Sequence, residues 1–136
     1  MTSSKSRPGW VVHLSGEAIE WLTSCTMDQA ALGRVMSNFN FIIQKIEIAG
    51  PTVGEPDIKK LIATDQLWEM RVKVPTGAYR MFFRFGKVAG HRIAAVAYGR
   101  KKSENDFPRS VIDLAQRKAD AFLTERGADG FVDADD

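Results

Sequence analysis

The sequence has little of what disulfide-bonded, metal-binding or membrane-spanning proteins require. Its 136 residues include one cysteine, Cys25, so no intrachain disulfide can form. With that cysteine, two distant histidines, His13 and His91, cannot complete a zinc site. No apolar run approaches the roughly 18 residues that cross a bilayer, and no Gly-rich phosphate loop joins a strand to a helix. We therefore expect a cytoplasmic protein with no metal, no cofactor and no membrane partner.

The charged residues are distributed unevenly. Residues 125–136 carry five acids and one base, whereas residues 68–118 carry twelve Lys and Arg and four acids. A clustered basic surface favours a polyanionic partner, with RNA or DNA ahead of membrane, although the same residues could merely keep strands and loops solvated. We expect one domain over residues 9–124. A disordered arm (residues 1–8), which lacks the apolar segment of a secretory signal, and a disordered acidic tail from residue 125 would flank it.

The first half of the chain predicts a strand and two helices. A β-prone run over residues 10–14 precedes a short helical pattern over residues 17–23. Thr26 and Gln29 then match a capping box. The longest helix follows and ends at Gly50, which is followed by Pro51. Its apolar stripe has helical spacing and consists of Leu32, Val35, Met36, Phe39, Ile42, Ile43 and Ile46.

The segment from residue 67 to residue 85 predicts a β-hairpin with two unlike faces. Residues 67–74 and 79–85 both alternate between apolar and other residues, and residues 75–78 supply a turn. That turn would pair Val74 with Tyr79. One face is then apolar and aromatic, and it should be covered by the two helices. The other face gathers cations: Arg71, Lys73, Arg80 and Arg84.

A third strand and a final helix complete the predicted domain. Residues 92–98 form a small-residue strand, residues 99–103 form a basic loop, and Asp106 to Pro108 open the last helix, with Asp106 as its cap. The fold class is therefore α+β. We expect a small, antiparallel-rich sheet that is packed by an N-terminal αα-hairpin and a C-terminal helix.

Four segments in this order make the chain similar to the phage-derived, HigB-like branch of the RelE/ParE toxin superfamily. They are Gly50-Pro51 with Gly54-Glu55-Pro56 and Lys59-Lys60-Leu61, Leu67-Trp68-Glu69-Met70-Arg71, Tyr79-Arg80-Met81-Phe82-Phe83, and Lys101-Lys102 followed by Pro108 and a helix. The resemblance implies a RelE-like fold and the toxin of a type II toxin–antitoxin module. It also implies a ribosome-dependent mRNA endonuclease and a cognate antitoxin that commonly binds DNA through a helix-turn-helix.

The resemblance also implies which residues act. Arg71, Arg80, Lys101 and Lys102 match the superfamily's working cations, which would stabilise negative charge on the scissile phosphate. Further candidates for substrate contact are Lys73, Arg84, Arg100, Phe107 and Arg109. The alternative for Arg80 is a structural ion pair with Glu69 or with an acid of the last helix, and the alternative for the two lysines is a solvated loop.

The proton-transfer group stays open at this stage. Several relatives carry a tyrosine near the start of the last helix, where this chain has Phe107, which cannot move a proton but could stack on a base. Tyr98 is a candidate, and His91 is a weaker one because it lies in a turn at the wrong end of its strand. The missing tyrosine keeps two other functions open. One is gyrase inhibition, as in the ParE branch, and the other is a phage-derived interaction protein without catalysis.

Overall fold

The computed structural model describes residues 9–62, 64 and 66–131, so the expected arm over residues 1–8 lies outside the described residues. Within these ranges six strands form one sheet in the order β1-β5-β4-β3-β2, and β6 pairs with β4. Strand β1 runs parallel to β5, and the other described pairs are antiparallel. The strands are β1 (Val11–Leu14), β2 (Ile58–Lys60), β3 (Trp68–Val74), β4 (Gly77–Val88), β5 (His91–Lys102) and β6 (Ala128–Phe131). The α+β class is confirmed.

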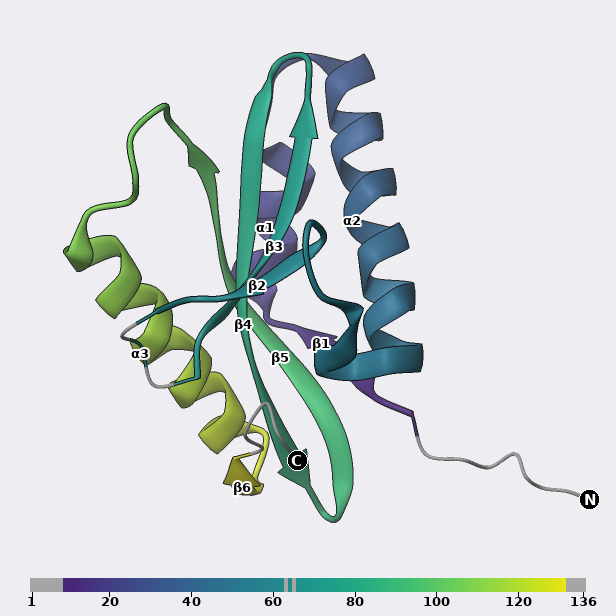
Figure 1. Cartoon of the computed structure of the whole chain (residues 1–136), viewed down its shortest axis with the longest axis vertical. Helices are drawn as coiled ribbons and strands as arrows, with labels where there is room; N and C mark the ends of the chain where they lie inside the picture. Colours follow the sequence, from purple (N-terminus) through teal and green to yellow (C-terminus); the bar gives the residue numbers. More distant parts are fainter. Residues whose placement is uncertain (1–8, 63, 65, 132–136) are drawn as a thin grey trace, which may run out of the picture.

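Three α-helices cover the two faces of this sheet in the described chain (Figure 1). Helices α1 (Gly16–Ser24) and α2 (Gln29–Ala49) pack on one face, and α3 (Arg109–Glu125) packs on the other. A short 3-10 helix, η2 (Gly50–Val53), follows α2. The expected αα-hairpin and C-terminal helix are thus confirmed. None of the helices in the described ranges combines the length and the apolar character that a membrane crossing requires.

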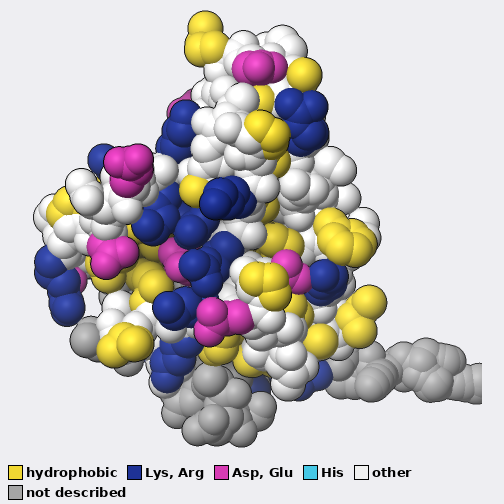
Figure 2. All heavy atoms as spheres, turned by 45° about the horizontal axis from the view of Figure 1, so that its top comes forward, with side chains coloured by type: hydrophobic (Ala, Val, Ile, Leu, Met, Phe, Trp, Pro, Cys, Tyr) yellow, Lys and Arg dark blue, Asp and Glu magenta, His cyan; other side chains and the backbone are white. Residues whose placement is uncertain are grey.

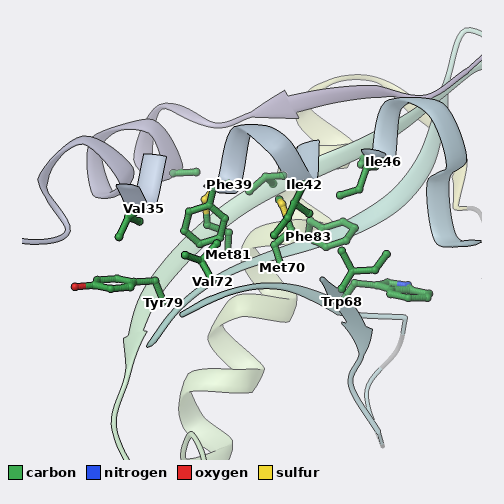
Figure 3. Packing of buried hydrophobic residues seen from close by; sticks show 14 of the residues in the cluster. Val35, Phe39, Ile42, Ile46, Trp68, Met70, Val72, Tyr79, Met81 and Phe83 are labelled. Carbon is green, nitrogen blue, oxygen red and sulfur yellow. The ribbon is translucent and has the colours of Figure 1, made fainter. Parts of the chain in front are cut away.

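The larger hydrophobic core lies between α2 and the sheet. Figure 3 shows Phe39 and Ile42 of α2 pointing toward Met70 and Phe83 of the sheet. All four side chains are almost or entirely inaccessible to solvent. Each such burial contributes about 1.5–3 kcal/mol relative to an exposed side chain. The stripe that the helical spacing predicted therefore fixes α2 on this face.

A smaller core lies on the opposite face, under α3. Phe82 and Ala97 of the sheet pack there with Ala115 and Ala119 of α3. The small alanine side chains allow the helix to approach the sheet closely. Both faces of the sheet are consequently covered in part, and the expectation of one core face and one open cationic face was wrong for the middle of the sheet.

The β3–β4 hairpin is tighter than the sequence predicted. Val74 pairs with Gly77, and Tyr79 pairs with Val72 rather than with Val74, so two residues rather than four form the connection. The predicted register was wrong by two residues. Because side chains alternate with a period of two, a shift of two residues leaves every side chain on the predicted face.

Strand β5 is longer than predicted, and this changes where its basic residues point. Residues 99–102 were expected to form a loop, but they pair with residues 78–81 of β4. The long β4 strand supplies their hydrogen-bond partners. Lys101 and Lys102 are therefore consecutive strand residues, which point to opposite faces of the sheet.

Local expectations at the helix starts and at the chain's end were also corrected. Asp28 rather than Thr26 caps α2 by accepting a hydrogen bond from the Ala31 N–H at 3.0 Å. Helix α3 follows Pro108 without a side-chain cap, so Asp106 does not cap it. Part of the tail that was expected to be disordered forms β6, which pairs with the end of β4 that β3 leaves free. Residues 132–136 lie outside the described residues.

Gly50 is a position where both the backbone and its surroundings exclude a side chain. It has a φ of 57°, and a Cβ there would overlap the Trp10 indole. We expect Gly50→Ala to lower the free energy of unfolding by about 2 kcal/mol or more, through backbone strain and overpacking. Gly33 is the matched control, because it lies in α2 with nothing within 4 Å of its Cβ position.

Urea denaturation followed by tryptophan fluorescence measures both variants. Gly33→Ala should raise the free energy of unfolding by about 0.5–1 kcal/mol, because alanine loses less backbone entropy on folding than glycine. Equal effects at the two positions would contradict the described contact between Gly50 and Trp10.

Candidate functional site

A cleft of about 420 Å³ lies on the α3 face of the sheet. Strands β2 and β3 and the end of β5 form one part of it, and the segment that leads into α3 forms the other. Figure 2 shows Lys and Arg side chains gathered near the middle of one face, around a hollow and with acidic side chains among them. The residues that line the cleft are Lys59, Leu61, Ile62, Glu69, Arg71, Lys102, Asp106, Phe107, Arg109 and Ile112.

Three arginines form a row across adjacent strands beside this cleft. Arg71 of β3 pairs with Arg80 of β4, and Arg80 pairs with Arg100 of β5. Residues directly opposite in antiparallel strands point to the same face, and like charges in such positions destabilise a sheet. This arginine row (Arg71, Arg80, Arg100) therefore needs a nearby anion.

Glu69 supplies that anion inside the protein. Its Oε1 lies 3.4 Å from Arg80 Nε, and its Oε2 lies 3.6 Å from Arg71 Nε. Only 6% of Glu69 and 7% of Arg80 are exposed to solvent. Arg71 is more accessible and also approaches the exposed Glu55, with 3.4 Å between Nη1 and Oε1. The Glu69 carboxylate, which lines the cleft, thus lies between the partly exposed guanidinium group of Arg71 and the buried one of Arg80.

The surroundings of Glu69 suit proton transfer. Burial raises the pKa of its carboxyl group above the usual value of 4.5, and the positive charges of Arg80 and Arg71 offset only part of that rise. A base is most effective when its pKa is closer to neutral pH. Glu69 is therefore a carboxyl group with a raised pKa that lines the cleft beside the partly exposed Arg71 guanidinium.

The two lysines of β5 lie on opposite faces of the sheet. Lys102 lines the cleft, where its Nζ lies 3.8 Å from Asp106 Oδ1. Lys101 points to the opposite face, and its Nζ lies 5.6 Å from the centroid of the Tyr79 ring. The sequence predicted both as site residues because it treated them as parts of a loop. The structure brings only Lys102 to the cleft.

Phe107 and Arg109 both line the cleft, as expected for substrate contact. Phe107 also packs edge-on against Phe82, with ring centroids 5.5 Å apart, so it joins α3 to the core while it forms one wall. Arg109 Nε lies 2.9 Å from Asp113 Oδ1 on the exposed first turn of α3. Their contact with a substrate stays a prediction.

The remaining candidates lie elsewhere. Tyr98 stacks on Phe82, accepts a hydrogen bond from Arg100 Nη1 at 2.9 Å, and does not line the cleft. Arg84 is 4% exposed and pairs with Asp120 at 2.7 Å, so it anchors α3 to the sheet. His91, which was expected in a turn, is the first residue of β5 and pairs with Val88, at the other end of the strand from Lys102.

Lys73 lines a second hollow beside α2, which it shares with Arg71. It therefore lies near the cleft without lining it.

Glu69 lines the cleft but was not among the predicted site residues. The sequence analysis considered Glu69 only as a structural ion-pair partner of Arg80. The signal was nevertheless present, because Glu69 is the one acid in β3 and alternation places it on the same face as Arg71.

A family model described as "Phage derived protein Gp49-like (DUF891)" matches residues 30–120. The match covers more than half of the chain and includes most of the sheet and the cleft. The chain belongs to this family. A search of curated proteins gave no significant match. The Gp49-like family thus supports the phage-derived part of the resemblance without specifying the reaction.

Because Arg80 is buried, its replacement by alanine should affect the stability of the fold. As an exposed cation it would contribute little to stability, but α3 packs on its face of the sheet and leaves it buried beside Glu69. We expect Arg80→Ala to lower the free energy of unfolding by about 2–4 kcal/mol, because it leaves a buried carboxylate with weaker compensation.

The loss should depend on pH. Without Arg80, the pKa of folded Glu69 rises further above the usual 4.5. As pH rises above 4.5, Glu69 of the unfolded chain releases its proton while Glu69 of the folded chain keeps it, so the free energy of unfolding falls. Denaturation at about pH 5 and about pH 8 should show the larger loss at the higher pH, whereas the exposed Arg109→Ala control should change stability by about 0.5 kcal/mol or less. Equal losses for Arg80→Ala at both pH values would exclude Glu69 as the group left without its partner.

Proposed function

We propose that the protein is the toxin of a type II toxin–antitoxin module and that it cleaves mRNA on the ribosome as a metal-independent endoribonuclease. The observation that carries this proposal is the buried Glu69 carboxylate, held between Arg71 and Arg80 on the floor of a basic cleft. Membership in the Gp49-like family, which is associated with toxin–antitoxin modules, supports it, as does the resemblance to the RelE/ParE superfamily.

Residues that line the cleft supply the acid and the base of the proposed reaction. In the proposed mechanism Glu69 takes the proton from the 2′-hydroxyl, whose oxygen forms a bond to the adjacent phosphorus. The bond from phosphorus to the 5′-oxygen breaks, which leaves a 2′,3′-cyclic phosphate and a free 5′-hydroxyl. We assign the protonation of the leaving oxygen to Lys102, which lines the same cleft.

The arginines stabilise the transition state in this mechanism. The phosphorane carries more negative charge than the substrate phosphate, and guanidinium groups held in position stabilise that charge without reorganising. Arg71 is the better placed of the two for direct contact, since it lines the cleft and is partly exposed, whereas Arg80 is buried. Arg80 then acts mainly by positioning Glu69. A cognate antitoxin would neutralise the protein by covering this cleft or by excluding it from the ribosome.

A reconstituted bacterial translation reaction tests the proposal. Wild-type protein should cut a translated message, with fragment ends in phase with codons, and Glu69→Gln should cut it about 10²–10⁴-fold more slowly because the amide cannot accept the proton. The wild-type rate should rise with pH through the pKa of Glu69, above 4.5, since only the ionised carboxyl group is a base. That rise should be lost in Glu69→Gln.

Thermal unfolding of Glu69→Gln is the necessary control, because the side chain is buried. A folded variant that still cuts the message at the wild-type rate would exclude Glu69 as the base. An intact message, with growth arrest in cells that express the wild type, would contradict the nuclease and direct attention to gyrase inhibition.

The two lysines of β5 provide a matched pair. Lys102→Ala should slow message cleavage at least tenfold, because it removes a cation and proton donor from the cleft. Lys101→Ala should leave the rate within about twofold, because its side chain points to the other face of the sheet. The same translation reaction measures both variants, and equal losses would contradict the described placement of the two side chains.

A further inference from the structure

A second hollow of about 240 Å³ adjoins the cleft on the α2 side of β3. Arg71 lines both the cleft and this hollow, so the two share a wall. The remaining lining residues come from α2, from Asp57 before β2, and from β3: Asn38, Phe41, Ile42, Lys45, Asp57, Val72 and Lys73. Apart from Arg71, no residue that lines this hollow takes part in the proposed mechanism.

The sheet is open where the cleft and the hollow meet. Strand β2 pairs only with residues 68–70 of β3, and the Arg71 N–H then donates to the Asp57 carbonyl at 2.9 Å. Beyond Arg71, no strand in the described ranges lies along this edge of β3. An extended chain that leaves the cleft past Arg71 can therefore enter the hollow.

Phe41 gives this hollow an aromatic surface. The core-facing residues of α2, among them Phe39 and Ile42, are buried, but Phe41 points outward and is 59% exposed. The Lys45 Nζ lies 4.6 Å from the centroid of the Phe41 ring and 2.6 Å from Asp57 Oδ2. Burial in the core therefore does not account for Phe41, and Lys45 and Asp57 hold the adjacent side of the hollow in place.

The charge of the hollow matches a nucleic acid backbone. Asp57 offsets the charge of Lys45. Lys73 is exposed, and Arg71 remains partly exposed although it pairs with Glu69 and Glu55, so these two cations can approach a phosphate. Sites for single-stranded RNA combine such cations along the backbone with aromatic rings on which bases stack. A second protein is a poorer match, since apart from Phe41 the accessible lining is largely polar.

We propose that this hollow is a second nucleotide subsite, which binds the nucleotide next to the one cleaved in the adjoining cleft. Phe41 stacks on its base, and Lys73 and Arg71 contact the phosphate that links it to the scissile nucleotide. The proposal rests on the proposed endoribonuclease function and extends it. It makes Phe41 a substrate-positioning residue that takes no part in the chemical step.

Binding and cleavage by Phe41→Ala test the subsite. A short, fluorescein-labelled, 2′-O-methyl RNA of mixed sequence resists cleavage and reports binding by fluorescence anisotropy. Phe41→Ala should bind it about tenfold more weakly, the size of one base–aromatic stack, and Phe41→Trp should restore the affinity. In the translation reaction Phe41→Ala should raise the message concentration that gives half the maximal rate and leave the maximal rate unchanged.

Ile48→Ala is the matched control, because Ile48 is 84% exposed on the same helix and does not line the hollow. It should bind RNA like the wild type. Phe41→Ala that binds and cleaves like the wild type would overturn the subsite while leaving the proposed function in place. The subsite would also be overturned if Phe41→Ala bound and cleaved RNA like the wild type but no longer bound an antitoxin protein, since the hollow would then be a protein interface. A wild-type protein that neither binds nor cleaves RNA would instead overturn the proposed function.

Discussion

The buried ion pairs of Glu69 organise the basic half of this protein. Antiparallel pairing forces Arg71, Arg80 and Arg100 onto one face of three adjacent strands, where their charges repel. The Glu69 carboxylate lies between the first two, and its burial raises its pKa even beside these cations. The same contacts thus stabilise the sheet and leave a carboxyl group that can exchange a proton next to fixed positive charge.

The helices cover the two faces of the sheet unequally, and this determines where solvent can reach the residues around Glu69. On one face, α1 and α2 bury an extended aromatic core. On the other, α3 contacts the middle of the sheet through alanines and through the pair of Arg84 with Asp120. The cleft remains where α3 begins, beside the short strand β2 and the open edge of β3. The candidate site therefore lies beside the sheet, away from the main core.

Much of the fold could be predicted from periodicity. The stripe of α2 and the alternation in β3 and β4 assigned the faces correctly, and the assignment survived a register error because that error was an even number of residues. The same alternation was not applied to Lys101 and Lys102, which were treated as a loop because their hydrogen-bond partners are about 20 residues away in sequence. The β6 pairing and the role of Arg84 were missed for the same reason, since both depend on contacts between distant parts of the chain.

The site was predictable only in part. Residue type indicated phosphate-binding cations, but burial decides which of them are structural, and burial depends on the position of α3. Glu69 was not considered as a candidate base, because a carboxylate among arginines ordinarily forms a structural ion pair. Its raised pKa follows from desolvation, which no local pattern shows.

The chemical nature of the cut ends tests the central claim most directly. If Glu69 activates the 2′-hydroxyl, the upstream fragment of a message cut by the wild-type protein must end in a 2′,3′-cyclic phosphate or its 3′-phosphate hydrolysis product, and the downstream fragment in a 5′-hydroxyl. Ligation and kinase assays on the two fragments distinguish these ends, and the fragments should form about 10²–10⁴-fold more slowly when Glu69→Gln replaces the wild type. A 3′-hydroxyl with a 5′-phosphate, or fragments that form at the wild-type rate with the variant, would contradict the account.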